Sequence, residues 1–468
     1  MELDPLLLSR IQFAFVVSFH AIFPVFTIGL AAYIAVLEGL SYKTGDAVYE
    51  KLSKFWIKVF AVVFGMGVVS GIVMAFQFGT NWSNFSYSAA NFLGPILSYE
   101  VVTAFFLEAT FLGVLLFGRD RVPRGTHLFA ACMVAIGTFI SSFWILSANS
   151  WMHTPAGVEM REGLIHVTSW VEAIFNSSFI YRFSHMAVAS FITGAVVVAG
   201  VSALYLRQGR NPETSRRALK MCVILLAVAA PAQLVLGDLH GLNTFEHQPA
   251  KVAAMEGHWE TMEGAPLVLF AIPDAAAETN RLEIAIPKLG SLILTHSLDG
   301  EVPGLKSFAE EDRPPVGIVF WSFRVMVALG MLFIGVYLFA LVQLLRGRLY
   351  DSPRLLRLMT WMIPTPFVAV LAGWFVTEIG RQPWIIQDMM RVSEGVTPAL
   401  SGWMALATLI GYIAVYAAVF GAGVYYLSRL IAKGPDPIDA DSSTESARPK
   451  RPWSAVDTSF DKEQEAGA

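Results

Sequence analysis

Nine long apolar stretches dominate this sequence and restrict the folds that it can adopt. Each is about 20 residues long or longer, which is the length an α-helix needs to cross the hydrocarbon core of a bilayer. The sequence therefore predicts an all-α, polytopic membrane protein with about nine transmembrane helices. The predicted spans are 11–37, 55–78, 95–117, 127–150, 183–206, 221–239, 316–345, 361–379 and 399–430.

The composition supports the same class. Hydrophobic residues make up 55% of the chain and charged residues 15%, with a mean hydropathy of +0.56, whereas soluble domains average about 25% charged residues. Both cysteines, Cys132 and Cys222, lie inside apolar stretches, so neither a disulfide framework nor a paired-cysteine metal site is predicted. The acidic N-terminus lacks a basic segment before the first stretch, which favours a retained helix over a cleaved signal peptide. No feature predicts binding to nucleic acid.

The short loops predict the orientation, because cytoplasmic loops of membrane proteins are enriched in lysine and arginine. With the N-terminus outside, the inner loops carry fourteen lysines and arginines, and the outer segments carry five. The five outer residues are Arg10, Arg161, Arg182, Arg381 and Arg391. The chain then divides into helices one to six (1–240), an outer connection (241–315), helices seven to nine (316–432) and a cytoplasmic tail (433–468). The tail is rich in Asp, Ser, Glu, Lys and Pro, a composition that predicts disorder.

The segment GWFVTEIGRQPW, at 373–384, closes the eighth stretch with ionisable side chains. An ionisable residue in a spanning helix is a candidate for function because it is expensive to place there. Glu378 is such a residue, and Arg381 follows one helical turn later as a partner for the carboxylate or for a bound anion. The alternative is an interfacial ion pair that marks the helix end, with Trp374 and Trp384 as aromatic anchors.

Four potential metal ligands lie on four different helices, all in the outer half of the predicted membrane: His20, His185, Met326 and Glu378. Histidine and methionine on facing helices are axial ligands of a low-spin haem, whereas a single histidine or carboxylate leaves an iron position open for oxygen. Taken singly, each residue has a simpler interpretation. A histidine can hydrogen-bond to a neighbouring helix, and a methionine can fill an irregular core.

Two arginines accompany the predicted ligands. Arg324 precedes Met326 by two residues, and Arg182 precedes His185 by three. Guanidinium groups bind carboxylates in a bidentate manner, so both arginines are candidates for neutralising haem propionates. The alternative is that each extends its charged end to the membrane interface.

The third span carries two carboxylates, Glu100 and Glu108. A separation of eight residues corresponds to a rotation of about 80° beyond two full helical turns and to about 12 Å along the axis. Two carboxylates on one apolar helix suggest a proton relay through the membrane. The alternative is that each is neutral and hydrogen-bonded to a neighbouring helix.

The outer connection contains the sequence QPAKVAAME, with Lys251 and Glu256, followed closely by His258 and Trp259. Charged residues in a loop are usually solvated. They are also suitable as donors, acceptors and a general base for a polar ring such as a quinol.

These motifs together resemble subunit I of the cytochrome bd quinol oxidases. The resemblance rests on GRQPW with Gly373, Trp374 and Glu378, on SRIQFAF with His20, on WSFRVM with Met326, and on QPAK with Glu256. The Glu100/Glu108 pair and His185 agree with it. The resemblance extends from the N-terminus to the ninth span and excludes the tail. The outer connection is compact and resembles the short-loop branch of the family, which includes cyanide-insensitive oxidases.

The resemblance implies specific cofactors and sites. It implies a low-spin haem b558 on His185 and Met326, and two high-spin haems near His20 and Glu378. The high-spin haems would be b595 and either haem d or a further haem b. It also implies quinol oxidation at Lys251 and Glu256 and proton delivery through Glu108 and Glu100.

The expected function is therefore that of a terminal quinol:oxygen oxidoreductase in the bacterial inner membrane. Expected partners are a second large subunit, a small single-helix subunit, ubiquinol or menaquinol, oxygen and membrane lipid. Charge separation would arise because protons are released outside and taken up from the cytoplasm, without pumping. Two alternatives are a cofactor-free proton-coupled transporter and a quinol cytochrome that does not bind oxygen.

Overall fold

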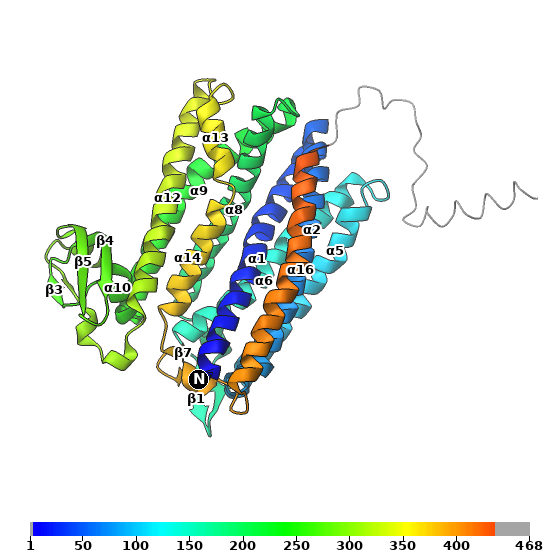
Figure 1. Ribbon diagram of the computed structural model, residues 1–468. Coiled ribbons are helices and arrows are strands. Elements are labelled where there is room, and N and C mark those ends of the chain that lie inside the picture. The colour runs from blue at the N-terminus through cyan, green and yellow to red at the C-terminus, as the bar shows by residue number, and fades with distance from the viewer. Residues whose placement is uncertain (1–2, 436–468) are drawn as a thin grey trace, which may run out of the picture.

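The computed structural model describes residues 3–435, so nearly all of the tail predicted to be disordered, 433–468, lies outside the described residues. The described chain is a bundle of long, roughly parallel helices (Figure 1). Within these residues, eight helices are long and apolar enough to cross a membrane, and a bent pair raises the number to nine. The predicted fold class is thereby confirmed.

Nine segments form the spans. Seven of the spans are single helices. In the third span a π-helical turn separates two α-helices, and the eighth span is a bent pair of helices. The spans are α1 (Pro5–Thr44), α2 (Ala47–Thr80), α4–η1–α5 (Ala90–Glu100, Val101–Phe105, Phe106–Phe117), α6 (Arg124–His153), α8 (Phe179–Arg207), α9 (Pro212–His247), α12 (Val316–Leu345), α13 with α14 (Pro353–Trp361, Thr365–Ile379) and α16 (Gly402–Lys433).

The strands and short helices connect these spans, chiefly at the end of the bundle where the chain begins, which we call the strand end (Figure 1). Four two-stranded antiparallel sheets pair β1 with β2, β3 with β6, β4 with β5 and β7 with β8. The strands are β1 (Val158–Arg161), β2 (Leu164–Val167), β3 (Met262–Glu263), β4 (Leu267–Asp274), β5 (Thr279–Ile286), β6 (Glu301–Val302), β7 (Trp384–Ile386) and β8 (Met390–Arg391). The short helices are α3 (Ser83–Ser88), α7 (Trp170–Ile174), α10 (Pro249–Glu256), α11 (Leu289–Thr295), η2 (Leu305–Ser307), η3 (Glu310–Asp312) and α15 (Val392–Gly395).

Most helices are longer than the apolar stretches that predicted them. Helix α6 continues to His153 and α9 to His247, beyond the predicted ends at residues 150 and 239. The outer connection therefore starts at Gln248 and not at residue 241. In the extension of α9, Asn243 donates a hydrogen bond to the Ser177 carbonyl, whereas Thr244 and His247 bond carbonyls of α9 itself. Hydropathy alone does not reveal such bonds.

The eighth span is the clearest departure from the prediction. It was expected as one helix over 361–379, but two helices, α13 and α14, meet at an angle of 41°. Pro364 and Pro366 lie at the break. Proline has no amide hydrogen to donate within a helix, so the hydrogen-bond ladder is interrupted there and the span bends.

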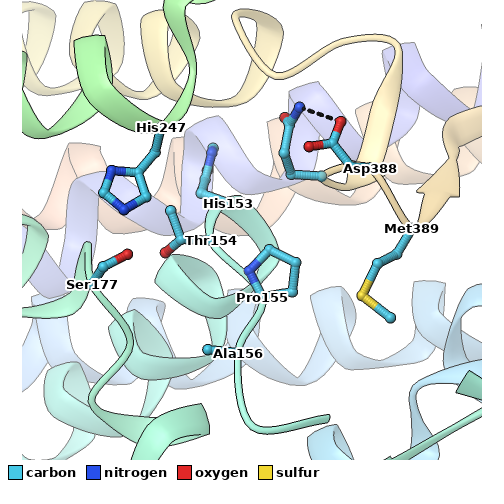
Figure 2. Close-up of a pocket in the computed structure, with 9 residues that line it drawn as sticks. His153, Thr154, Pro155, Ala156, Ser177, His247, Asp388 and Met389 are labelled. Atoms are coloured by element: carbon cyan, nitrogen blue, oxygen red, sulfur yellow. Dashed lines mark hydrogen bonds between the residues drawn. The ribbon is translucent and has the colours of Figure 1, made fainter. Parts of the chain in front are cut away.

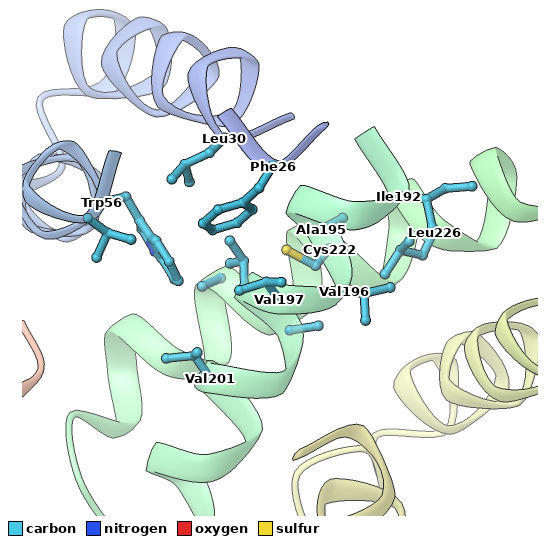
Figure 3. Packing of buried hydrophobic residues seen from close by; sticks show 14 of the residues in the cluster. Phe26, Leu30, Trp56, Ile192, Ala195, Val196, Val197, Val201, Cys222 and Leu226 are labelled. Carbon is cyan, nitrogen blue, oxygen red and sulfur yellow. The ribbon is translucent and has the colours of Figure 1, made fainter. Parts of the chain in front are cut away.

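Helix α1 lies at the centre of the packed core. A Cβ built on Gly29 would lie 2.1 Å from the Ser190 carbonyl oxygen of α8, and one built on Gly194 would lie 2.9 Å from Gly29. Small residues let membrane helices approach this closely. Beside this crossing, Phe26, Leu30 and Trp56 pack against aliphatic side chains of α8 and α9 (Figure 3). The contact fixes α1 relative to α8, and these two helices carry His20 and His185.

Candidate cofactor and proton-transfer site

Glu378 occupies the last turn of α14 and is held by two hydrogen-bonded neighbours. Its Oε2 accepts a hydrogen bond of 2.6 Å from Nη2 of Arg381, and its Oε1 accepts one of 2.7 Å from Nδ2 of Asn149 on α6. Nε2 of His153 lies 3.6 Å from Oε1, beyond hydrogen-bond distance. The predicted Glu378–Arg381 pair is therefore present, and α6 completes the set around the carboxylate.

Three cations are buried around this one carboxylate. The exposed fractions of Lys251, Arg182 and Arg381 are 3%, 5% and 6%. Nε of Arg182, and Nε and Nη1 of Arg381, have no hydrogen-bond partner among the residues described. Unpaired buried charge is strongly unfavourable, so this cluster requires additional anionic groups.

Burial perturbs the two cations of this cluster that lie outside the spans. It lowers the pKa of the Lys251 ammonium well below its usual value, and the charges of Arg182 and Arg381 act in the same direction. The pKa of Arg381 is also lowered by burial, which the neighbouring Glu378 opposes. Both effects arise because the charged form loses solvation while like charges stand nearby.

Lys251 does not project into solvent, as a loop lysine usually does. Its Nζ lies 3.3 Å from Nδ1 of His153 and donates a hydrogen bond of 3.1 Å to Oε1 of Gln248. The short helix α10 thus directs Lys251 into the bundle, towards the group around Glu378. The other predicted quinol residue, Glu256, lies at the far end of α10 and is directed towards α12.

Arg324 is the partner of Glu256. Its Nη2 lies 3.0 Å from Oε2 of Glu256, and its Nε donates a 3.0 Å hydrogen bond to the carbonyl oxygen of Val268. The carbonyl of Met255 accepts a further bond. We expected this guanidinium to neutralise a haem propionate. In the structure its donors are occupied by protein groups that tie the outer connection to α12.

Each of the three other predicted ligands faces a glycine on a neighbouring helix. A Cβ on Gly71 would lie 3.2 Å from Cε1 of His20, and one on Gly237 would lie 3.4 Å from Cε1 of His185. A Cβ on Gly373 would lie 3.1 Å from Sδ of Met326. Because glycine has no side chain, each of these three predicted ligands has room beside it. The pairs are His20 with Gly71, His185 with Gly237, and Met326 with Gly373.

The histidine of α1 is oriented by a serine. Nδ1 of His20 lies 2.9 Å from Oγ of Ser70, and that hydroxyl donates its own hydrogen to the Gly67 carbonyl. The hydroxyl oxygen is therefore an acceptor, so Nδ1 carries the hydrogen and Nε2 keeps its lone pair. Such an outer partner commonly fixes the tautomer of a metal-binding histidine.

The ligand candidates fall into two groups. Helix α14 packs against both α8 and α12, and Gly373 of α14 contacts Met326, so His185, Met326 and Glu378 belong to adjoining helices. His240 also lies against His185, with ring centroids 5.5 Å apart. His20 lies on the α1/α2 side and shares no hydrogen bond with the Glu378 group within residues 3–435. Nε1 of Trp374 is buried and without a partner among the same residues, so this tryptophan is not the interfacial anchor considered above.

The third span places its two carboxylates on one face. The turn between Glu100 and Glu108 is π-helical, Val101–Phe105, and a π turn takes up about one additional residue. One residue corresponds to about 100°, so the offset predicted as about 80° is reduced to about 20°. Both side chains consequently face α6.

The two carboxylates contact α6 at positions one helical turn apart, Ser141 and Gly137. Oε1 of Glu100 accepts a 2.8 Å hydrogen bond from Oγ of Ser141. Glu108 is 6% exposed and lies over Gly137, where a Cβ would come within 2.6 Å of its Cγ. Oε1 of Glu108 has no partner among the described residues, so this carboxylate retains a free acceptor.

The π turn has its own support from α6. Nε1 of Trp144 donates a 2.9 Å hydrogen bond to Oγ1 of Thr103, and that hydroxyl donates to the Tyr99 carbonyl at 2.6 Å. The Trp144 ring stacks on Tyr99 with centroids 5.5 Å apart. Thr103, inside the π turn, thus binds a carbonyl of the last turn of α4, and Trp144 holds Thr103 in place.

A pocket opens beside His153 at the strand end. Its volume is about 350 Å³, and its lining includes His153, Thr154, Ser177, His247 and Asp388 (Figure 2). Gln387, also in the lining, accepts a 2.9 Å hydrogen bond from Gln248, the residue that binds Lys251. The pocket therefore approaches the Lys251 end of the cation cluster.

Sequence reasoning missed Asn149 and His153. Asn149 follows Ser141 by eight residues and His153 follows it by twelve. At about 100° per residue these intervals rotate the two side chains by about 80° and 120° away from Ser141, so the face of α6 that meets Glu100 and Glu108 does not point to them. The predicted span also ended at residue 150 and left His153 in a loop. In the described part of the chain, no three His, Cys, Asp or Glu side chains gather to bind a bare metal ion.

These features define a class of protein: a polytopic helical membrane protein with candidate histidine, methionine and carboxylate ligands, and buried arginines with unpaired donors, between its helices. The family profile described as "Cytochrome bd terminal oxidase subunit I" matches residues 8–435. The chain belongs to this family. It is accordingly a transmembrane oxidoreductase subunit of electron transport, in a family whose members contain haem.

Individual relatives agree over nearly the full length. The chain is 33% identical to the cytochrome bd-II ubiquinol oxidase subunit 1 of Escherichia coli, over 94% of this chain and 99% of the relative. It is 35% identical to the cytochrome bd ubiquinol oxidase subunit 1 of Bacillus subtilis, over 93% and 95%. The solved bd oxidase of Geobacillus thermodenitrificans has a TM-score of 0.87 at 30% identity, covering 93% of this chain and 100% of that chain.

Proposed function

We propose that this chain is the quinol-oxidising, oxygen-reducing subunit of a terminal respiratory oxidase. Quinol, either ubiquinol or menaquinol, is oxidised at the outer face, and oxygen is reduced to water inside the bundle. One low-spin and two high-spin haems supply the electron transfer and the oxygen chemistry when they are bound. The observation that carries the proposal is the buried cation cluster around Glu378, beside ligands that face glycines.

The chain's residues fit haem as the bound group. Haem propionates are anionic, and Arg182 and Arg381 have unpaired buried donors that suit them. His185 and Met326 would hold the low-spin haem b558. His20 and Glu378 would each hold a high-spin haem, one being haem b595 and the other haem d or haem b, with Trp374 beside Glu378. The hydrogen bonds from Asn149 and Arg381 would orient the Glu378 carboxylate.

The proposed quinol site lies at α10. Lys251 is buried and its pKa is lowered, so it is suited to accept a proton from a quinol hydroxyl. Glu256 is fixed by Arg324 and would orient the ring. Protons released here would reach the outer surface through the pocket beside His153.

Protons consumed in oxygen reduction would come from the opposite side, through Glu108 and Glu100 along α6. Because quinol protons leave on one side and substrate protons arrive from the other, the reaction would be electrogenic without a pumping cycle. The lysines and arginines of the loops favour an orientation with the N-terminus and the outer connection outside and the tail in the cytoplasm. A second large subunit and a small single-helix subunit would complete the enzyme in the bacterial inner membrane.

A reduced-minus-oxidised spectrum of the purified complex, recorded with and without carbon monoxide, tests the proposal. We expect a low-spin component that carbon monoxide leaves unchanged and a high-spin component that it shifts. An absence of haem bands would favour a proton-coupled transporter. Haem bands without a CO-sensitive part would favour a quinol cytochrome that does not bind oxygen. Pigment extraction would then identify the haem types.

A further inference from the structure

The hairpin β4–β5 has an apolar face that no other described element covers. Leu282 is 74% exposed, Ile284 61%, Leu269 49% and Ile272 45%. Phe270 and Ile286, on the same two strands, are 38% and 42% exposed. Soluble surfaces rarely present so many large apolar side chains together, so this face requires a nonpolar environment.

The opposite face of the hairpin is already occupied by the protein. Val268 and Ala271 are buried in a small cluster with Phe320 of α12, and Ala285 packs against it. The carboxylate of Glu283 accepts a 2.7 Å hydrogen bond from Asn280, whose amide also donates to the Gly257 carbonyl. Val268, Ala271 and Ala285 therefore face the protein, whereas the larger apolar side chains of the two strands remain exposed.

Contacts with α12 give the position of the hairpin relative to the membrane. The ring of Phe270 lies 5.2 Å from that of Trp321, and Arg324 binds the Val268 carbonyl. Helix α12 begins at Val316, so a rise of 1.5 Å per residue puts these contacts about 7 Å and about 12 Å along the span. The hairpin therefore lies beside the first turns of a membrane-spanning helix, as Figure 1 also shows.

The apolar face continues the lipid-facing surface of that helix. Ile318, Trp321 and Val325 of α12 are 52%, 38% and 39% exposed. Tryptophan at such a position is typical of the membrane interface. At the tip of the hairpin Arg281 pairs with Asp274, and Glu283, the other charged residue of the two strands, accepts a hydrogen bond from Asn280. Apolar side chains thus adjoin the span while an ion pair lies at the tip, an arrangement suited to the boundary between headgroups and acyl chains.

We propose that the outer face of β4–β5 is inserted in the lipid leaflet at the strand end, with phospholipid acyl chains as its occupant. The hairpin is a membrane-interface anchor that holds α10, and with it Lys251 and Glu256, at the depth of the leaflet. This inference goes beyond the proposed reaction, because it concerns how the protein sits in the bilayer and does not depend on its electron donor.

Spin labelling of the complete enzyme in phospholipid vesicles tests the anchor. Nitroxide labels are attached to Leu282→Cys and Ile284→Cys, with Glu301→Cys on β6 as a control, in a chain carrying Cys132→Ser and Cys222→Ala. Without quinol the resting enzyme does not consume oxygen. We expect oxygen, which concentrates in lipid, to relax the first two labels strongly and a water-soluble nickel chelate to relax them weakly. The Glu301→Cys label should show the reverse.

Two outcomes would overturn the proposal. Nickel relaxation of the Leu282→Cys and Ile284→Cys labels as strong as that of the control would place this face in water. Protection from both reagents would place it under another protein subunit.

A second measurement needs no labelled variant. Phospholipids with a photoreactive acyl chain are cross-linked to the unmodified enzyme, and the modified peptides are identified by mass spectrometry. We expect adducts on β4–β5 as well as on the first turns of α12. The variant with Leu282→Ser and Ile284→Ser should lose at least half of the hairpin adducts while the α12 adducts remain. Adducts on α12 with none on the hairpin of the unmodified enzyme would contradict insertion.

Discussion

Nζ of Lys251 lies 3.3 Å from Nδ1 of His153, and this contact joins the short helix α10 to the end of α6. Lysine is seldom buried this completely, because its ammonium group is strongly solvated in water. Burial, followed by the charges of Arg182 and Arg381, depresses the pKa of Lys251. A lysine in this state can accept a proton at a pH where an exposed lysine remains charged.

The first prediction concerns the pH dependence of quinol oxidation. Only the free amine of Lys251 has a lone pair, so kcat/KM should rise with pH as the ammonium loses its proton, in a range below its usual pKa of 10.5. Lys251→Met keeps the length of the side chain but does not titrate. It should remove this rise and lower kcat/KM by about 100-fold or more, the usual contribution of a general base.

The matched control is Lys288→Met, because Lys288 is an exposed lysine paired with Asp299 in the same connection. Steady-state oxygen uptake with a soluble quinol, measured across pH, compares the two variants. A Lys251→Met enzyme that kept the pH profile of the unmodified enzyme would exclude Lys251 as the proton acceptor. The CO-difference spectrum should be the same in both variants.

The second prediction concerns the excess of buried positive charge. Arg381→Gln removes the partner of Glu378 and two of the unpaired donors, and should weaken haem retention at this site. Removing one partner of a buried ion pair typically costs about 3–5 kcal/mol. Haem per protein, measured on the purified complex, should fall, together with the amplitude of the CO-sensitive band.

Arg391→Gln is the control for this variant. Arg391 pairs with Asp312 at 2.6 Å, but the pair is partly exposed, with side-chain fractions of 31% and 36%. Exposed pairs contribute about 0–1 kcal/mol, so haem content should be unchanged. Equal haem loss in both variants would show that the effect is not specific to the Glu378 site.

The third prediction tests the thioether on α12. Met326→Leu keeps the volume of the side chain but removes the sulfur, so the low-spin haem should become high-spin or be lost while CO binding elsewhere persists. Met331→Leu is the control, since Met331 lies on the same helix and is 52% exposed. A low-spin band unchanged in Met326→Leu would exclude Met326 as a ligand.

The spans were predictable because the bilayer imposes one strong rule on them. A membrane helix needs about 20 predominantly apolar residues to cross the bilayer, so hydropathy indicated all nine spans, and the seventh was predicted to the residue as Val316–Leu345. The same rule singled out Glu378 and Arg381, which the structure pairs. A charged residue in an apolar stretch is rare, so each one indicates a candidate functional residue.

Features that depend on partners distant in the chain could not be predicted from the sequence. Arg324 was assigned to a propionate because Met326 is near it in sequence, yet its guanidinium binds Glu256 and the Val268 carbonyl. In the π turn of the third span, Thr103 accepts a hydrogen bond from Trp144 of another helix. His153 lies only a few residues beyond the predicted end of its span, but its contact with Lys251 became evident only from the packing of α10.

The last prediction concerns Gly137, which makes room for Glu108. A Cβ at Gly137 would lie 2.6 Å from Cγ of Glu108, closer than nonbonded carbon atoms can approach. Gly137→Ala should therefore displace the carboxylate from the face that it shares with Glu100 and slow oxygen reduction by about 10-fold or more, since small misplacements of reacting groups have large effects. Oxygen uptake at saturating quinol measures the change.

Gly113→Ala is the matched control, because a Cβ at Gly113 of α5 meets nothing within 4 Å. Both changes replace glycine by alanine in a spanning helix, so both should gain the same helix propensity, about 1 kcal/mol. Only Gly137→Ala should lose turnover, with haem bands unchanged. If Gly137 acts through Glu108, adding Gly137→Ala to Glu108→Gln should cause little further loss, since residues in contact are not additive. A full additional loss in the double variant would show that Gly137 acts on something other than the carboxylate.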